Sequence, residues 1–190
     1  MNTIQLHTIS LVLLAFLSLN NTTHAADISA GKDKAVVCQQ CHGSNGNSKN
    51  PQYPNLAGQR TMYLETQLKN FQSGERTNSV MQGMTANLTK PDITNISAYF
   101  ASLTTESAGS SDLSLAKKGK EKFAMCAGCH GSSALGRGSF PRLAGQQPKY
   151  IEKQLLAFKN RSRKGGPMNA MTSSLSEQDI KEIAAYLGSL

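Results

Sequence analysis

The stretch "MCAGCHG" at residues 125–131 decides the fold, because "VCQQCHG" at residues 37–43 has the same pattern. In each stretch two cysteines stand three positions apart, and a histidine follows the second cysteine directly. All four cysteines of the 190-residue chain lie in these two clusters. Disulfides, zinc binding, a redox-active dithiol and covalently attached haem all use cysteines at such spacings.

The two clusters belong to a duplicated sequence. An offset of 87 to 88 residues brings the halves into register, and "PNLAGQ" at 54–59 then matches "PRLAGQ" at 141–146. Such self-similarity indicates two copies of one structural unit. Further matched pairs are Tyr63 and Tyr150, Gln67 and Gln154, Leu68 and Leu155, Phe71 and Phe158, Leu88 and Leu175, Ile93 and Ile180, and Tyr99 and Tyr186.

A polar, Ser/Gly-rich stretch, "TTESAGSSD", separates the two copies and has the composition of a linker. We therefore predict domains at residues 26–103 and 113–190, joined by a linker at residues 104–112. Each domain of about 80 residues buries little core by itself and is expected to need a staple or a cofactor.

The hydrophobic pattern predicts an all-α fold. Apolar residues at helical spacing predict helices over 60–72 and 147–159, and each cysteine cluster is expected at the end of a helix, over 28–41 and 115–129. Ser176 with Asp179, and Thr89 with Asp92, have the spacing of a capping box at the start of each last helix. No run alternates with period two, so strands are not expected.

The first 26 residues contain no Lys, Arg, Asp or Glu, and residues 9–19 are an apolar run. That run suits a secretory signal and is short for a membrane-spanning helix. We predict a signal peptide at residues 1–25 and a periplasmic protein. The run is preceded by no basic side chain, so an uncleaved anchor, and hence association with the membrane, is the alternative.

The formal charge of +8 is unevenly distributed, with +2 on residues 27–105 and +6 on residues 106–190. A basic half can dock on acidic proteins or anionic membranes, because charge steers encounter. Nucleic acid is not an expected partner of an exported chain that has 6% aromatic residues and no groove-binding or base-stacking motif.

Covalent haem explains both clusters best. Disulfides do not explain the histidine after each cysteine pair, a redox dithiol is expected among strands, and zinc needs four ligands where one cluster offers three. In a haem site the two thiols add to the vinyl groups, and the histidine, His42 or His130, binds the iron. We predict two haem c groups, attached through Cys38, Cys41, Cys126 and Cys129.

A count of histidines restricts the second axial ligand of each iron. His7 and His24 lie in the predicted signal, so the mature chain keeps one histidine for each cluster. Methionine is then the expected ligand, and it raises the reduction potential. Met62 and Met125 have no counterpart in the other half, whereas two methionine pairs are repeated. The residues alone leave both members of each pair open. The pairs are Met81 with Met84 and Met168 with Met171.

The order of these motifs resembles the di-haem cytochrome c4 family across essentially the whole mature chain. Cys-x-x-Cys-His-Gly is followed in both halves by "YPNLAGQ" or "FPRLAGQ", and then by Met-x-x-Met. The resemblance implies two tandem class I cytochrome c domains related by a pseudo-twofold axis, each with one haem. In that family the ligand methionine lies seven residues before the leucine that precedes the last helix, which implies Met81 and Met168.

The resemblance also implies a hydrogen bond from each histidine to the carbonyl oxygen of a proline. Pro54 would serve His42, and Pro141 would serve His130. Such a bond fixes the imidazole ring and increases its donation to the iron.

An iron with both axial positions filled offers no place for a substrate, so we expect one-electron transfer and no enzymatic activity. The expected role is a periplasmic carrier between a quinol-oxidising complex and a terminal oxidase or reductase. The alternative is a cytochrome subunit held on a periplasmic dehydrogenase, such as a flavocytochrome. A peroxidase ranks third, because it would need an iron with an open position.

Overall fold

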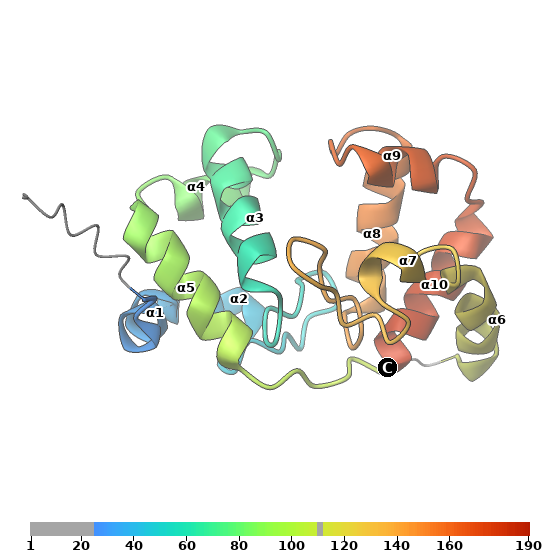
Figure 1. Cartoon of the computed structure of the whole chain (residues 1–190), viewed down its shortest axis with the longest axis horizontal. Helices are drawn as coiled ribbons and strands as arrows, with labels where there is room; N and C mark the ends of the chain where they lie inside the picture. The colour runs from blue at the N-terminus through green and yellow to red at the C-terminus, as the bar shows by residue number, and fades with distance from the viewer. Residues whose placement is uncertain (1–24, 110–111) are drawn as a thin grey trace, which may run out of the picture.

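The computed structural model describes residues 25–109 and 112–190, and this part of the chain is helical (Figure 1). The predicted signal peptide lies outside the described residues except for Ala25. No strand forms within the described part, where one antiparallel bridge joins Arg137 to Phe140. The predicted all-α class is therefore confirmed. The helices are α1 (Ile28–Lys34), α2 (Val36–His42), α3 (Thr61–Ser73), α4 (Ser79–Thr85), α5 (Lys90–Ser102), α6 (Leu113–Phe123), α7 (Ala127–His130), α8 (Pro148–Lys159), α9 (Pro167–Thr172) and α10 (Glu177–Ser189).

The last helix of each half begins at the predicted capping box. The Thr89 hydroxyl accepts a hydrogen bond from the Asp92 N–H, and the Asp92 carboxylate accepts one from the Thr89 N–H. Ser176 and Asp179 make the same reciprocal pair at α10. Both boxes satisfy backbone donors that a helix start would otherwise leave unpaired.

The helix before each cysteine cluster is broken, so the prediction of one continuous segment was wrong. Helix α1 ends at Lys34 and α2 begins after Ala35, while α6 ends at Phe123 and α7 begins after Cys126. Tight hydrogen bonds close the breaks, from the Cys38 N–H to the Ala35 oxygen at 2.9 Å and from the Cys126 N–H to the Phe123 oxygen at 2.8 Å. The breaks let the chain bury Ala35 and Phe123 in the core and then turn the histidine inward.

Each half has its own apolar core, built where its first and last helices cross. A Cβ added to Gly31 of α1 would lie 2.1 Å from the backbone oxygen of Asn95 in α5. One added to Gly119 of α6 would lie 1.9 Å from that of Glu182 in α10. Only glycine permits so close a crossing. The larger core residues are Leu64, Ile96, Tyr99 and Phe100 in the first half, and Phe123, Ile151, Ile180, Ile183 and Leu187 in the second.

The two halves lie side by side, with α3 and α8 nearest the contact between them (Figure 1). Gln59 binds the backbone of Arg142, donating to its oxygen at 2.9 Å and accepting from its N–H at 2.7 Å. Gln146 binds the backbone of Asn55 in the same way, at 2.9 and 2.7 Å. These residues are equivalent in the duplicated sequence, so each half offers the other the same surface. This reciprocity is the predicted pseudo-twofold relationship.

The predicted linker is tied to both halves. The Thr105 hydroxyl donates to the Ala57 oxygen at 2.7 Å, the Ser107 hydroxyl donates to the Gly188 oxygen at 2.8 Å, and the Ala108 N–H donates to the Gly145 oxygen at 3.2 Å. The segment between the last helix of one half and the first of the other therefore takes part in the contact. The domain boundaries at 26–103 and 113–190 stay a prediction.

Candidate haem sites

The four cysteines are free thiols, arranged alike in the two halves. Cys38 and Cys126 are half-buried, and Cys41 and Cys129 are exposed. Burial raises the pKa of the Cys38 and Cys126 thiols, which keeps them protonated at neutral pH. Across residues 25–109 and 112–190, no three His, Cys, Asp or Glu side chains gather as they would around a zinc ion.

Each histidine of the clusters is buried and makes the expected contact with a proline. The His42 Nδ1 lies 2.9 Å from the Pro54 oxygen, and the His130 Nδ1 lies 3.0 Å from the Pro141 oxygen. A carbonyl oxygen can only accept, so Nδ1 carries the proton and Nε2 keeps a lone pair for a metal. Burial also lowers the pKa of both imidazoles, which favours this neutral form.

An aromatic ring, to which the sequence motifs alone assign no role, also contacts each histidine. The rings of Tyr53 and His42 meet edge-on with centroids 6.2 Å apart, and Phe140 and His130 meet in the same way at 6.2 Å. Each aromatic residue stands directly before the proline that binds its histidine. The signal was present in the motifs "YP" and "FP", which repeat in register.

The repeated methionines lie on two short helices, α4 and α9, which the hydrophobic pattern did not predict. Met81 and Met168 are half-buried, whereas Met84 and Met171 are 39% and 37% exposed. The buried Thr85 hydroxyl donates to the Met81 oxygen at 2.9 Å, and the equivalent Thr172 does so to Met168 at 2.8 Å. The unrepeated Met62 and Met125 are exposed. Iron ligation by Met81 and Met168 stays a prediction that this arrangement favours.

Comparison with known proteins places the chain in a family. The family model for cytochrome c matches residues 28–104 and 116–190, once in each half. Cytochrome c4 of Pseudomonas aeruginosa is 38% identical over 194 residues, which cover 94% of this chain and 96% of the relative. The chain belongs to the cytochrome c4 family.

A solved structure and a second relative extend this comparison. The crystal structure of reduced recombinant cytochrome c4 from Pseudomonas stutzeri superposes with a TM-score of 0.83, at 34% identity, covering 87% of this chain and all of that one. A thiosulfate dehydrogenase electron acceptor of Thiomonas intermedia is 37% identical, over 84% of this chain and 80% of the relative. The chain is therefore an electron-transfer protein with two covalently bound haem c groups, one for each domain.

The contact between the domains contains two arginines that lie outside the predicted motifs. Arg76 donates to Gln67 in its own half and reaches across to Tyr150, at 2.8 and 2.9 Å. Arg163 donates to Gln154 in its own half at 2.6 Å and reaches across to Tyr63 at 3.1 Å. The two arginines are equivalent in the duplicated sequence. Their repetition at an offset of 87 was the signal that could have found them.

These guanidinium groups lack an anionic partner in the described part of the chain. Arg76 and Arg163 bind amide and phenol oxygens, and no arginine there forms an ion pair with a carboxylate. Burial alone would raise the pKa of Tyr63, but the nearby charges of Arg163 and Arg76 lower it. A half-buried cation is usually paired with an anion. Haem has two propionate carboxylates, so a bound haem could supply the anionic partner that the protein does not.

Proposed function

We propose that this protein is a periplasmic one-electron carrier between a quinol-oxidising complex and a terminal oxidase or reductase. The observation that carries the proposal is the repetition of one complete ligand set in both halves. Each half has two free thiols, a buried histidine held by a proline oxygen, and a half-buried methionine on a short helix. When bound, each haem supplies a one-electron iron couple.

In this proposal the chain's own residues bind and orient the two haems. Cys38 and Cys41 attach one haem, and Cys126 and Cys129 attach the other. His42 with Met81 would bind the iron of the first haem, and His130 with Met168 would bind that of the second. Pro54 and Pro141 hold the histidine rings, with their Nδ1 protons committed to the carbonyl oxygens.

The same ligand set argues against an enzymatic activity. Two protein ligands for each iron would leave no coordination position for a substrate or a peroxide. Carbon monoxide is a direct probe, because it binds reduced haem that has an open or weakly held position. We expect no binding to the native reduced protein, and rapid stoichiometric binding would favour a peroxidase-like activity instead.

Export is supported by the sequence of the first 25 residues, which lie outside the described part apart from Ala25. Among the described residues, no helix is both long enough and apolar enough to span a bilayer. A peripheral contact with the membrane would then come from the basic surface, through attraction to anionic lipid. Fractionation of cells that produce the full chain tests this, and release in the periplasmic fraction at moderate salt is the expected result.

A second candidate is a cytochrome subunit that receives electrons from a bound dehydrogenase. The relative named thiosulfate dehydrogenase electron acceptor favours this candidate. Purification distinguishes the two functions. A free di-haem protein that is reduced by quinol with membranes containing a quinol–cytochrome c reductase supports the carrier. Stable co-elution with a catalytic chain, and no quinol-dependent reduction, would support the subunit.

A further inference from the structure

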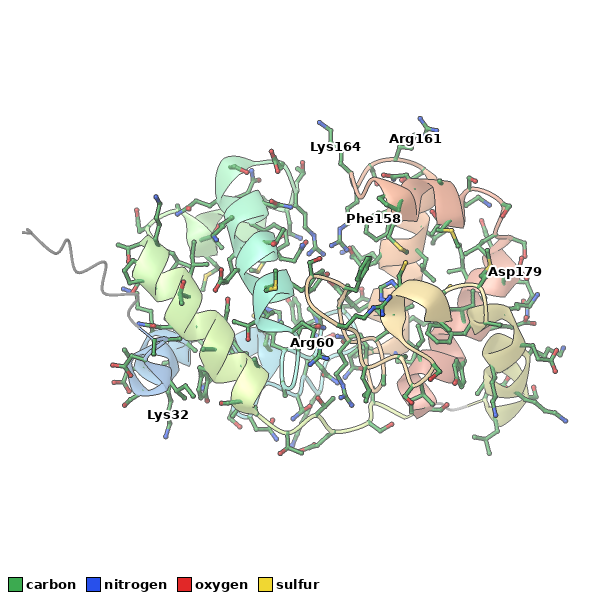
Figure 2. All side chains as sticks on the ribbon, viewed as in Figure 1. Lys32, Arg60, Phe158, Arg161, Lys164 and Asp179 are labelled. Carbon is green, nitrogen blue, oxygen red and sulfur yellow. The ribbon has the colours of Figure 1, made fainter. Side chains whose placement is uncertain are left out.

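An exposed pair of cations lies beside the helix that carries Met168. Arg161 and Lys164 border a hollow of about 480 Å³, whose other lining residues are Gly166, Asn169 and Ala170. Both cationic side chains point away from the body of the protein (Figure 2). The hollow therefore lies between two solvent-facing positive charges and Asn169, the residue directly after the proposed C-terminal haem ligand.

Arg161 holds its position at a conformational cost. Its φ is +61°, in the left-handed region that favours glycine, and the equivalent residue of the first half is Gly74 with φ +80°. An arginine there is strained where glycine is not. Strain of this kind is retained when the side chain has another use.

The corresponding turn of the first half is not basic: residues 74–77 (Gly-Glu-Arg-Thr) have no net charge, whereas residues 161–164 (Arg-Ser-Arg-Lys) have a net charge of +3. The two halves have the same backbone fold, so the difference in charge comes from the side chains alone. The pseudo-twofold axis therefore relates a basic turn on the C-terminal domain to a turn of no net charge on the N-terminal domain.

Helix stabilisation does not account for Arg161. A cation near the C-terminus of α8 would offset the negative end of the helix dipole. Lys159 already does this, because it lies in the last turn and donates to the Leu175 oxygen. Arg161 lies beyond the helix end and points into solvent (Figure 2).

We propose that Arg161 and Lys164 form a docking site for a carboxylate-rich face of a one-electron redox protein, which exchanges electrons with the C-terminal haem. This inference rests on the proposed carrier function. The site lies against α9, so an acidic partner seated there approaches the C-terminal haem and not the N-terminal one. Opposite charges speed the encounter and fix its orientation.

The test replaces these two cations of the second half by the residues that stand at the equivalent positions of the first half. Arg161→Gly with Lys164→Thr removes both cations with residues that the N-terminal domain already uses there, and relieves the strain at residue 161. Lys32→Gln with Lys90→Gln is the control, because it removes two exposed cations from the N-terminal domain and leaves the same net charge. All proteins are prepared with both haems and oxidised.

The readout is stopped-flow reduction by reduced plant-type ferredoxin, a small acidic protein that gives one electron to one ferric haem. At low ionic strength we expect the double variant at 161 and 164 to react about 5-fold more slowly than wild type, and the control to change less than about 2-fold. Near 0.5 M salt the difference shrinks to less than about 2-fold, because salt screens exposed charges. The reverse change, Gly74→Arg with Glu75→Ser and Thr77→Lys, raises the rate.

Three results would overturn the docking site. The two double variants could slow ferredoxin equally, which would assign the effect to net charge. Ferredoxin could be unaffected while binding to phosphatidylglycerol vesicles is lost, which would assign the cations to a membrane surface. Hexaammineruthenium(II), a cationic reductant, could slow to the same extent, which would indicate damage to the haem site. Failure of both reductants with wild type would instead contradict the carrier function.

Discussion

Gln59 and Gln146 each form hydrogen bonds with the backbone of the opposite domain, at equivalent positions. Each accepts a backbone N–H of the opposite domain at 2.7 Å and donates to the carbonyl oxygen of the same residue at 2.9 Å. Both glutamines are buried. Gln59 binds Arg142, which directly follows the proline that contacts His130. Gln146 binds Asn55, which directly follows the proline that contacts His42. In each domain one loop therefore contributes both to the domain contact and to the haem site.

Removing either glutamine should loosen the pairing of the domains. Gln59→Ala leaves the backbone N–H and oxygen of Arg142 unpaired, and we expect a loss of about 1–3 kcal/mol in the free energy of unfolding. Gln146→Ala should behave alike, and the double variant should unfold in two steps in urea. Gln52→Ala, at an exposed position, is the control and should change stability by less than about 0.5 kcal/mol. Unchanged single-step unfolding of the double variant would contradict this expectation.

The methionine assignment predicts which variant loses a spectral band. Oxidised His/Met haem has a sulfur-to-iron charge-transfer band. We expect Met81→Ala and Met168→Ala each to remove about half of its intensity, because one of two haems loses its sulfur ligand. The matched controls Met84→Ala and Met171→Ala should keep the whole band. The reverse pattern would transfer the ligand role to the second methionine of each pair.

The arginines of the domain contact should raise the haem potentials. A positive charge close to a haem disfavours the ferric state, which carries one more positive charge than the ferrous state. Replacing Arg76 or Arg163 by Gln should lower the summed midpoint potentials by about 30–60 mV, where 59 mV corresponds to a tenfold change for a one-electron couple. A redox titration measures this. Arg161→Gly removes an exposed cation instead, and a shift as large as that of Arg76→Gln would refute a special role for the arginines at the contact.

The capping box of α10 should make stability depend on pH. Hydrogen bonds from Lys122 and Ser176 hold the pKa of Asp179 well below its ordinary value of 3.8. Its folded pKa is depressed, so its contribution is complete above about pH 5 and is lost as the pH falls through 3.8 toward the folded value. Asp179→Asn should therefore melt at a lower temperature at neutral pH and lose less between about pH 5 and pH 3 than wild type does. Asp33→Asn, on the exposed face of α1, should keep the wild-type dependence.

Much of the molecule could be predicted from its repeats. The duplication, the helical class and both capping boxes depend on local residue patterns, and the structure contains them. The contact of His42 with Pro54 was expected from the family resemblance. Local patterns carry such features because the residues that make them are close in sequence or repeat in register.

The parts that were missed depend on tertiary packing. The break at Ala35 is needed to bury that residue and still turn His42 inward, and a periodicity argument cannot detect such a change of direction. The helices α4 and α9 are too short to show a clear apolar stripe. Arg76 and Arg163 looked like ordinary surface cations, because one sequence does not indicate which faces of two domains meet.

The reciprocal contact has the form of a homodimer interface enclosed in one chain. The tied segment between Thr105 and Ala108 keeps the two halves at a fixed, high effective concentration, so their pairing survives any dilution. In a true homodimer every substitution would appear on both subunits. A tandem gene product is free of that constraint, and it can place Arg161 on one half while the other keeps Gly74. Fusion thus allows two symmetric domains to differ in surface charge. A redox partner can then distinguish one domain from the other, which gives electron transfer a direction.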